Sequence, residues 1–166
     1  MPAPTRRTAS AATDSLGVLG RVPSGIYVLS IGRGEQATGM LASWVMQAGF
    51  DPPMVSVAVR MGRYVAERLS AGEPFVLNIV GHQQKHLLKH FGAGFEPGQP
   101  AFEGLHVLTA GCGAPALTEV VGWLECQPKS HIDSGDHRVF LAEVSGGQLN
   151  RDATPMVHIR NTGAHY

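Results

Sequence analysis

The chain has 166 residues, a length typical of one domain. Lys plus Arg and Asp plus Glu each number 13, so the formal net charge is zero with histidine neutral. This balance excludes a protein that binds nucleic acids or anionic membranes mainly by electrostatics. Only 16% of the residues are charged, and there are 21 glycines and 11 prolines, which indicates a compact chain with many turns.

Targeting signals are absent from the sequence pattern. No apolar run approaches the roughly 20 residues of a membrane span, and the polar N-terminus lacks the apolar core of a secretory signal. Cys112 and Cys126 have no CxxC spacing, so a reducing cytoplasmic location is expected. Residues 1–15 are predicted to be a mobile tail, and residues 16–166 to form the folded domain.

Short strands dominate the predicted elements. The stretch GIYVLSI at 25–31 is rich in β-branched and aromatic residues. At 54–60, Val55, Val57 and Val59 alternate with smaller side chains, which predicts a strand with one buried face. Further strands are expected at 73–80, 104–110, 119–131 and 136–145, and within 155–166.

Two short helices are predicted between these strands. Val65, Ala66 and Leu69 have helical spacing within 62–71, and a second helix is expected at 83–91. Six or more short strands with small helices favour a mainly β barrel or sandwich over a βαβ sheet.

A glycine-rich stretch at 32–37 (GRGEQA) matches a relaxed dinucleotide-binding fingerprint. That chemistry requires a helix directly after the glycines, so that its first amides meet the pyrophosphate. Gly39 follows instead, with no N-cap residue or apolar helical stripe, so a hairpin turn is predicted.

Two groups of histidines have the residue types of a metal or catalytic site. His82, His86 and His90 are spaced by four, but no carboxylate or cysteine lies nearby to complete a metal site, so surface histidines and no metal are predicted. The stretch 131–137 (HIDSGDH) contains the residue types of a catalytic triad, but its Asp-Ser-Gly-Asp segment is typical of a turn. One functional role remains there: His137, just past the turn, would point into a pocket.

The stretch 39–53 (GMLASWVMQAGFDPP) places small residues around Trp44 and Gln47. Small residues let a ligand approach the backbone closely, so that main-chain amides can bind it. The alternative is a buried strand whose small residues pack under the tryptophan.

This stretch resembles the flavin reductase-like family, with Gly39, Ser43 and the pair at 52–53 in the positions of a family segment. Gly135-Asp136-His137 is similar to the family's Gly-Asp-His signature. The likeness runs from about residue 20 to the C-terminus, through PFVLNIV, LLKHF, PALTEVVGWLEC, GDHRVFLAEV and VHIRNTGAHY. It is closest to small stand-alone flavoproteins and to the C-terminal flavin reductase module of flavodiiron proteins. Leu41 and Trp44 replace a threonine and a serine of the wider family, so main-chain contacts to the flavin gain importance.

The resemblance implies an FMN-binding split β-barrel, Greek-key-like, with two or three short helices. It also implies bound FMN or FAD and a homodimer with the flavin near the interface. The residues implied to contact the isoalloxazine and ribityl chain are Leu41, Ala42, Ser43, Trp44, Val45, Gln47 and Ala48. Those implied near the phosphate are Ala58, Val59, Arg60, Arg63 and Tyr64, with Asn78 behind the site.

Two alternatives to these roles stay open. Arg60 and Arg63 suit a phosphate dianion but equally fit solvated surface charges, and Asn78 equally fits an edge-facing amide.

The implied activity is hydride transfer from NADH or NADPH to the flavin, with reduced flavin passing electrons to an acceptor that the sequence does not identify. His137 is the implied catalytic residue, beside the nicotinamide. The alternatives are a non-enzymatic electron-carrier flavoprotein and a split-barrel module that binds another ligand such as haem.

Overall fold

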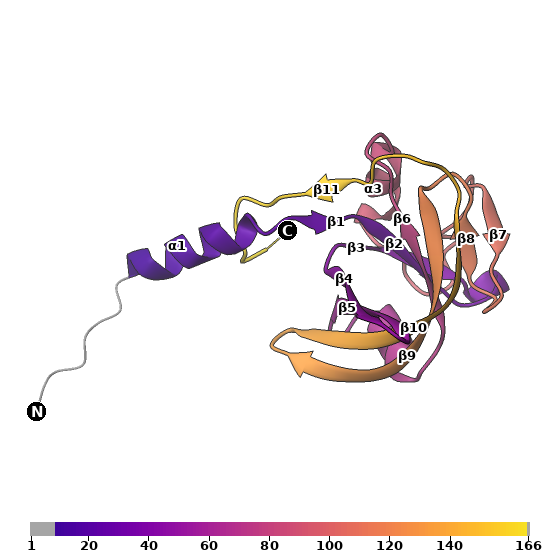
Figure 1. The fold of residues 1–166 in the computed structure, drawn as a ribbon, viewed down its shortest axis with the longest axis horizontal. Helices are drawn as coiled ribbons and strands as arrows, with labels where there is room; N and C mark the ends of the chain where they lie inside the picture. Colours follow the sequence, from indigo (N-terminus) through magenta and orange to yellow (C-terminus); the bar gives the residue numbers. More distant parts are fainter. Residues whose placement is uncertain (1–8, 166) are drawn as a thin grey trace, which may run out of the picture.

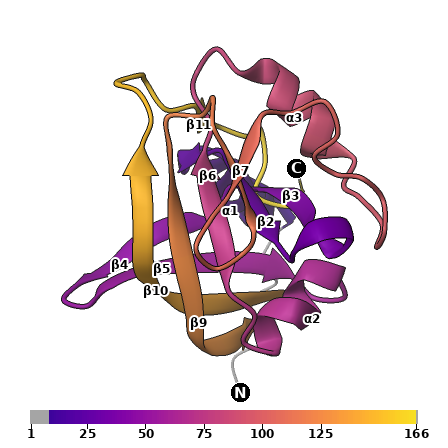
Figure 2. The same ribbon diagram turned by 90° about the vertical axis from the view of Figure 1, so that its right-hand side faces the viewer.

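The computed structural model describes residues 9–165, which form a curled antiparallel sheet with short helices around it (Figures 1 and 2). The sheet has seven strands in the order β3-β2-β6-β9-β10-β5-β4. They are β2 (Tyr27–Ile31), β3 (Thr38–Ala42), β4 (Val45–Phe50), β5 (Pro53–Arg60), β6 (Phe75–Ile79), β9 (Gly122–Ser134) and β10 (His137–Leu149). Strands make up 44% of the chain, and the predicted mainly β split-barrel fold is confirmed.

The two edges of this sheet are consecutive in the chain. β3 is one edge strand and β4 is the other, and only Ser43 and Trp44 connect them. The sheet must therefore curl until its edges approach each other at these two residues. We call this junction the seam, and it is the point at which the barrel is split.

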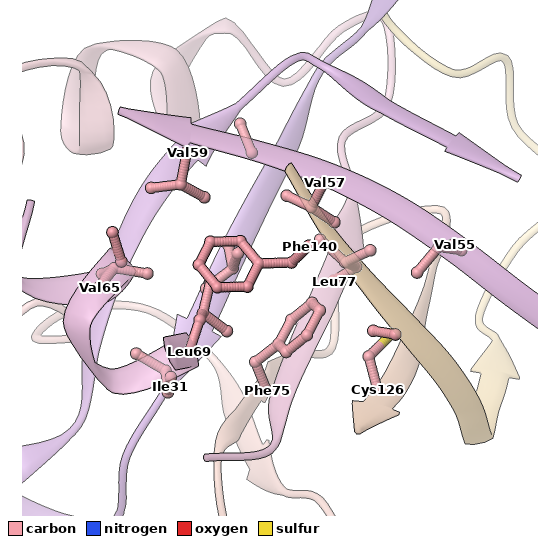
Figure 3. Close-up of a cluster of buried hydrophobic side chains, with 14 residues drawn as sticks. Ile31, Val55, Val57, Val59, Val65, Leu69, Phe75, Leu77, Cys126 and Phe140 are labelled. Atoms are coloured by element: carbon pink, nitrogen blue, oxygen red, sulfur yellow. The ribbon is translucent and has the colours of Figure 1, made fainter. Parts of the chain in front are cut away.

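The barrel interior is filled by apolar side chains from most strands and from α2 (Tyr64–Ser70) (Figure 3). Val55, Val57 and Val59 all point into it, which confirms the alternation predicted for this strand. Phe140 and Phe75 lie near the centre and are fully buried. α2 closes one end with Val65, Ala66 and Leu69, the three residues predicted from helical spacing.

Two smaller apolar clusters cover the outside of the sheet. α3 (Lys85–Gly92) buries Leu87 and Phe91 against Val28 and Val80. The small hairpin of β7 (Val107–Thr109) and β8 (Pro115–Leu117) packs near Val76 and Trp123. β8 was not predicted, because a three-residue strand beginning with proline has too little pattern.

An arm extends from the barrel (Figure 1). It consists of α1 (Ala9–Gly20), residues 21–25 with β1 (Ser24–Gly25), and residues 157–165 with β11 (Val157–His158). β1 and β11 pair antiparallel, and the Arg160 and Gly163 amides donate to the carbonyls of Gly20 and Leu16.

The helix α1 differs from the predicted mobile tail, because residues 9–15 are helical. Three alanines at 9, 11 and 12 favour the helix. Residues 1–8 lie outside the described part of the chain. No helix in the described part is long and apolar enough to cross a membrane.

Candidate functional site

The seam is bonded through its main chain to β5, the neighbour of β4. The Ala58 amide donates to the Trp44 carbonyl at 3.0 Å, beside the pairing of Val45 with Val57. Ser43 is buried and Trp44 is half-buried. At the seam, a buried serine therefore lies beside an indole that is partly open to solvent.

His137 enters the same place from the β9–β10 hairpin. Gly135 has φ +63°, the left-handed region that a two-residue hairpin turn requires at this position and that favours glycine. His137 is the first residue of β10 and lies opposite Arg60 of β5. The turn therefore aims the histidine at the end of β5, next to the seam.

Asp136 orients the His137 ring. Its Oδ1 lies 2.7 Å from Nδ1, and since a carboxylate only accepts, Nδ1 carries the proton and Nε2 faces the other way. This hydrogen bond holds the pKa of the Asp136 carboxyl below its usual value. The carboxylate therefore stays charged at neutral pH, and the bond is lost only in acid, as the pH falls through that lowered pKa.

Trp44 packs against His137 and also against a residue that sequence reasoning missed. The Trp44 and His137 ring centroids are 4.6 Å apart at an angle of 47°. Arg160, in the arm, places its guanidinium carbon 5.1 Å from the Trp44 ring centroid. The structure therefore joins Asp136, His137, Trp44 and Arg160 into one row of contacts across the seam.

Arg60 and Arg63 flank this row. Arg60 is exposed and close enough to Asp136 to help lower the pKa of that carboxyl. Arg63 precedes α2, and its side chain makes no capping bond to the helix. A Cβ built on Gly94 would lie 3.2 Å from the Arg63 guanidinium, so Arg63 reaches toward the loop after α3.

The Tyr64 ring lies under Arg68, 5.3 Å from its guanidinium carbon.

The remaining predicted residues take different positions. Val59 is buried in the barrel core, and Leu41 packs on the outer cluster under α3. Both side chains therefore contact other apolar side chains of the protein. Gln47 and Ala48 are exposed on the edge strand β4, and the Gln47 amide bonds only weakly to the Gly49 carbonyl at 3.3 Å.

Asn78 does not belong to this cluster. Its amide nitrogen donates to the Val28 carbonyl at 2.9 Å and to the Ser30 hydroxyl at 2.8 Å. Its oxygen accepts from the Leu117 amide at 2.7 Å. Asn78 is fully buried and joins β6 to β2 and β8, so it is not the edge-facing amide that the sequence also allowed.

Replacing Asn78 with alanine should lower the free energy of unfolding by roughly 2–4 kcal/mol, because three buried polar groups lose their partner. The flavin dissociation constant of the folded variant should stay within about twofold of the parent. Chemical denaturation and a flavin titration check the two halves. A large loss of flavin affinity without destabilisation would contradict this structural role.

The other sequence motifs take structural roles. Gly32 and Gly34 have positive φ in a 3₁₀ turn between β2 and β3, as the predicted hairpin requires. His82 and His86 are exposed, whereas the His90 ring contacts the Ala101 carbonyl at 2.8 Å and packs near Phe95. Within residues 9–165, no three His, Cys, Asp or Glu side chains gather as metal ligands.

Known proteins are similar in sequence to most of this chain. The chain is 38% identical over 151 residues to diflavin flavoprotein A 1 of Synechocystis sp., covering 89% of this chain and 26% of that protein. It is 41% identical over 150 residues to the putative diflavin flavoprotein A 3 of the same organism, again covering 89% of this chain and 25% of that protein. The chain thus spans about a quarter of the length of these curated relatives.

A solved structure shares the whole fold. The NADH:FAD oxidoreductase SgcE6 of Streptomyces globisporus superimposes with a TM-score of 0.81 at 26% identity, covering 96% of this chain and 94% of SgcE6. The family described as flavin reductase like domain matches residues 19–164. The protein therefore belongs to the flavin reductase-like family.

Proposed function

We propose that this flavin reductase-like module transfers hydride from NADH or NADPH to a bound FMN or FAD and passes the electrons onward. The observation that carries the proposal is the seam, where Trp44, His137, Arg60 and Arg63 come from three separate parts of the chain. When bound, the flavin supplies the redox chemistry, and the protein supplies binding and orientation.

The residues at the seam fit a flavin. Ser43 and Ala58 have small side chains, so a flat ring can approach the main chain there, whereas the Ala42 side chain packs into the barrel core. Arg60 and Arg63 are exposed cations suited to a phosphate dianion. His137 presents its Nε2 edge beside them, because Asp136 occupies Nδ1.

His137 would orient the nicotinamide by its Nε2 edge. Hydride transfer requires no proton donor at the reacting carbon, so the seam needs no acid–base pair. The row of Asp136, His137 and Trp44 fixes the ring, which is the property that an orienting group needs.

Spectroscopy of the purified protein tests the proposal. A flavin reductase should bind added FMN or FAD, absorb near roughly 370 and 450 nm, and be bleached by NADH or NADPH without oxygen. A yellow protein that neither nucleotide bleaches would favour an electron carrier. Failure to bind either flavin would refute both, and a Soret band on haem addition would identify the third alternative.

Replacing Arg60 with alanine should weaken flavin affinity by roughly tenfold, because a charge-assisted bond to the phosphate is lost. The reduction rate at saturating flavin should change by less than about twofold. The matched control is Arg151→Ala, which removes an exposed arginine outside the seam. Fluorescence titration with FMN measures both, and equal affinities in the two variants would assign Arg60 to a solvated surface charge.

A homodimer is the proposed assembly. The arm exposes six apolar residues, more than isolated surface positions account for. They are Leu16, Val18, Leu19, Val22, Val157 and Ile159. Arg60 and Arg63 are also exposed in the single chain.

The double variant Val18→Lys/Ile159→Lys should be monomeric, because two charges would be buried in the proposed interface. The control is Leu149→Lys, a still more exposed apolar residue at the end of β10. Size-exclusion chromatography with light scattering measures the mass. A monomeric parent, or a double variant that stays dimeric, would contradict the proposal.

The two cysteines lie in separate apolar clusters. Cys126 lies in the barrel core and Cys112 in the outer cluster around Trp123, and both are free thiols. Burial raises the pKa of Cys126 to about 12, so this thiol stays protonated and unreactive.

A further inference from the structure

We propose that Arg160 and Trp44 are positioning residues for His137: Arg160 holds the indole, and the indole fixes the imidazole. The expected effect on the rate of flavin reduction rests on the proposed function. The expected effect on the orientation of the His137 ring depends only on the contacts described below. Arg160 lies 116 positions from Trp44 in the sequence, and no sequence pattern connects them.

The Trp44 ring is contacted by side chains from two distant segments. The Arg160 guanidinium carbon is 5.1 Å from the ring centroid, a cation–π distance. The His137 ring centroid is 4.6 Å from the same centroid. Movement of the indole would therefore change the space that the imidazole occupies.

The backbone that carries the Arg160 side chain is held by the arm. The Arg160 amide donates to the Gly20 carbonyl at 2.8 Å, and β11 pairs with β1 just before it. A Cβ on Gly20 would come within 2.6 Å of the Thr162 nitrogen, so glycine permits this close approach. The position of Arg160 is thus set by backbone pairing, while that of the Trp44 backbone is set by its bond to Ala58.

His137 is consequently fixed from two directions. Asp136 fixes its Nδ1 edge, and Trp44 limits the tilt of the ring. Only 14% of the His137 side chain is exposed, which leaves little freedom once both contacts are made. Loss of Arg160 should release the indole, broaden the orientations of the imidazole and slow a reaction that depends on its placement.

The first test uses flavin-free protein. The ring protons of His137, observed by NMR in histidine-labelled protein and assigned with His137→Gln, should carry a ring-current shift from Trp44. In Arg160→Ala, this shift should move toward the value in Trp44→Leu, whereas Arg160→Lys, which keeps a cation, should stay near the parent. An unchanged His137 spectrum in Arg160→Ala would overturn the proposal, whatever the protein's activity.

The second test is a double-mutant cycle on flavin reduction by NADH or NADPH. Arg160→Ala should slow reduction by roughly fivefold when His137 is present and by less than about twofold in the His137→Ala background, because coupled residues are not additive. The flavin affinity of Arg160→Ala should stay within about twofold of the parent. Arg151→Ala, which also removes one positive charge, is the control. Additive losses would overturn the proposed route through His137. If neither nucleotide reduces any variant, the proposed function fails while the NMR result still decides the positioning.

Discussion

Replacing His137 with alanine should slow reduction of the bound flavin by NAD(P)H by about 10- to 100-fold while changing flavin affinity by less than about threefold. The imidazole is held between Asp136 and Trp44 at the mouth of the barrel, so its loss removes an oriented group without disturbing Arg60 or Arg63. Anaerobic stopped-flow reduction and a parallel flavin titration measure the two quantities separately.

Two variants sharpen this result. Asp136→Asn keeps the size of the side chain but replaces an acceptor-only group with an amide, which frees the imidazole to take the other tautomer. The Asp136→Asn variant should therefore reduce flavin more slowly than the parent but faster than His137→Ala. His82→Ala removes an exposed histidine after β6 and should match the parent. Equal losses of rate and flavin affinity in His137→Ala would assign the residue to flavin binding instead.

Part of the local structure around the candidate site was predictable from neighbouring residues, whereas the roles of the site residues came from the family resemblance. Gly135 must accept a positive φ in a two-residue turn, and this alone places His137 at the start of a strand. Val55, Val57 and Val59 alternate because one face of β5 fills the barrel. Each of these inferences needs only neighbouring residues.

The remaining features depend on contacts between distant segments. The row from His137 through Trp44 to Arg160 exists only once β1 pairs with β11 and the sheet curls to its seam. Asn78 lies in a strand pattern that fits either an edge or a core, and only the positions of Ser30 and Leu117 decide the matter. Sequence reasoning could have suspected α1 from its alanines, but it read their polar surroundings as a tail.

Replacing Phe140 with alanine should lower the free energy of unfolding by about 3–5 kcal/mol, the usual cost of emptying a fully buried phenylalanine site. Phe140 lies in β10 between β9 and β5, with its ring among the side chains of the barrel core (Figure 3). Neighbours in two paired strands cannot collapse into the space, so much of the cavity should persist. The melting temperature should fall by roughly 10 °C.

The same variant separates the fold from the site. The Phe140 side chain faces the barrel interior, so the seam should survive in the folded variant, and saturating FMN should raise its melting temperature about as much as that of the parent. Ile132→Ala, an exposed position in the same hairpin, should leave stability within about 0.5 kcal/mol. A Phe140→Ala protein that melts within about 2 °C of the parent would mean that the core relaxes around the cavity. A stable variant that no longer binds FMN would instead mean that the barrel interior and the seam are one cooperative unit.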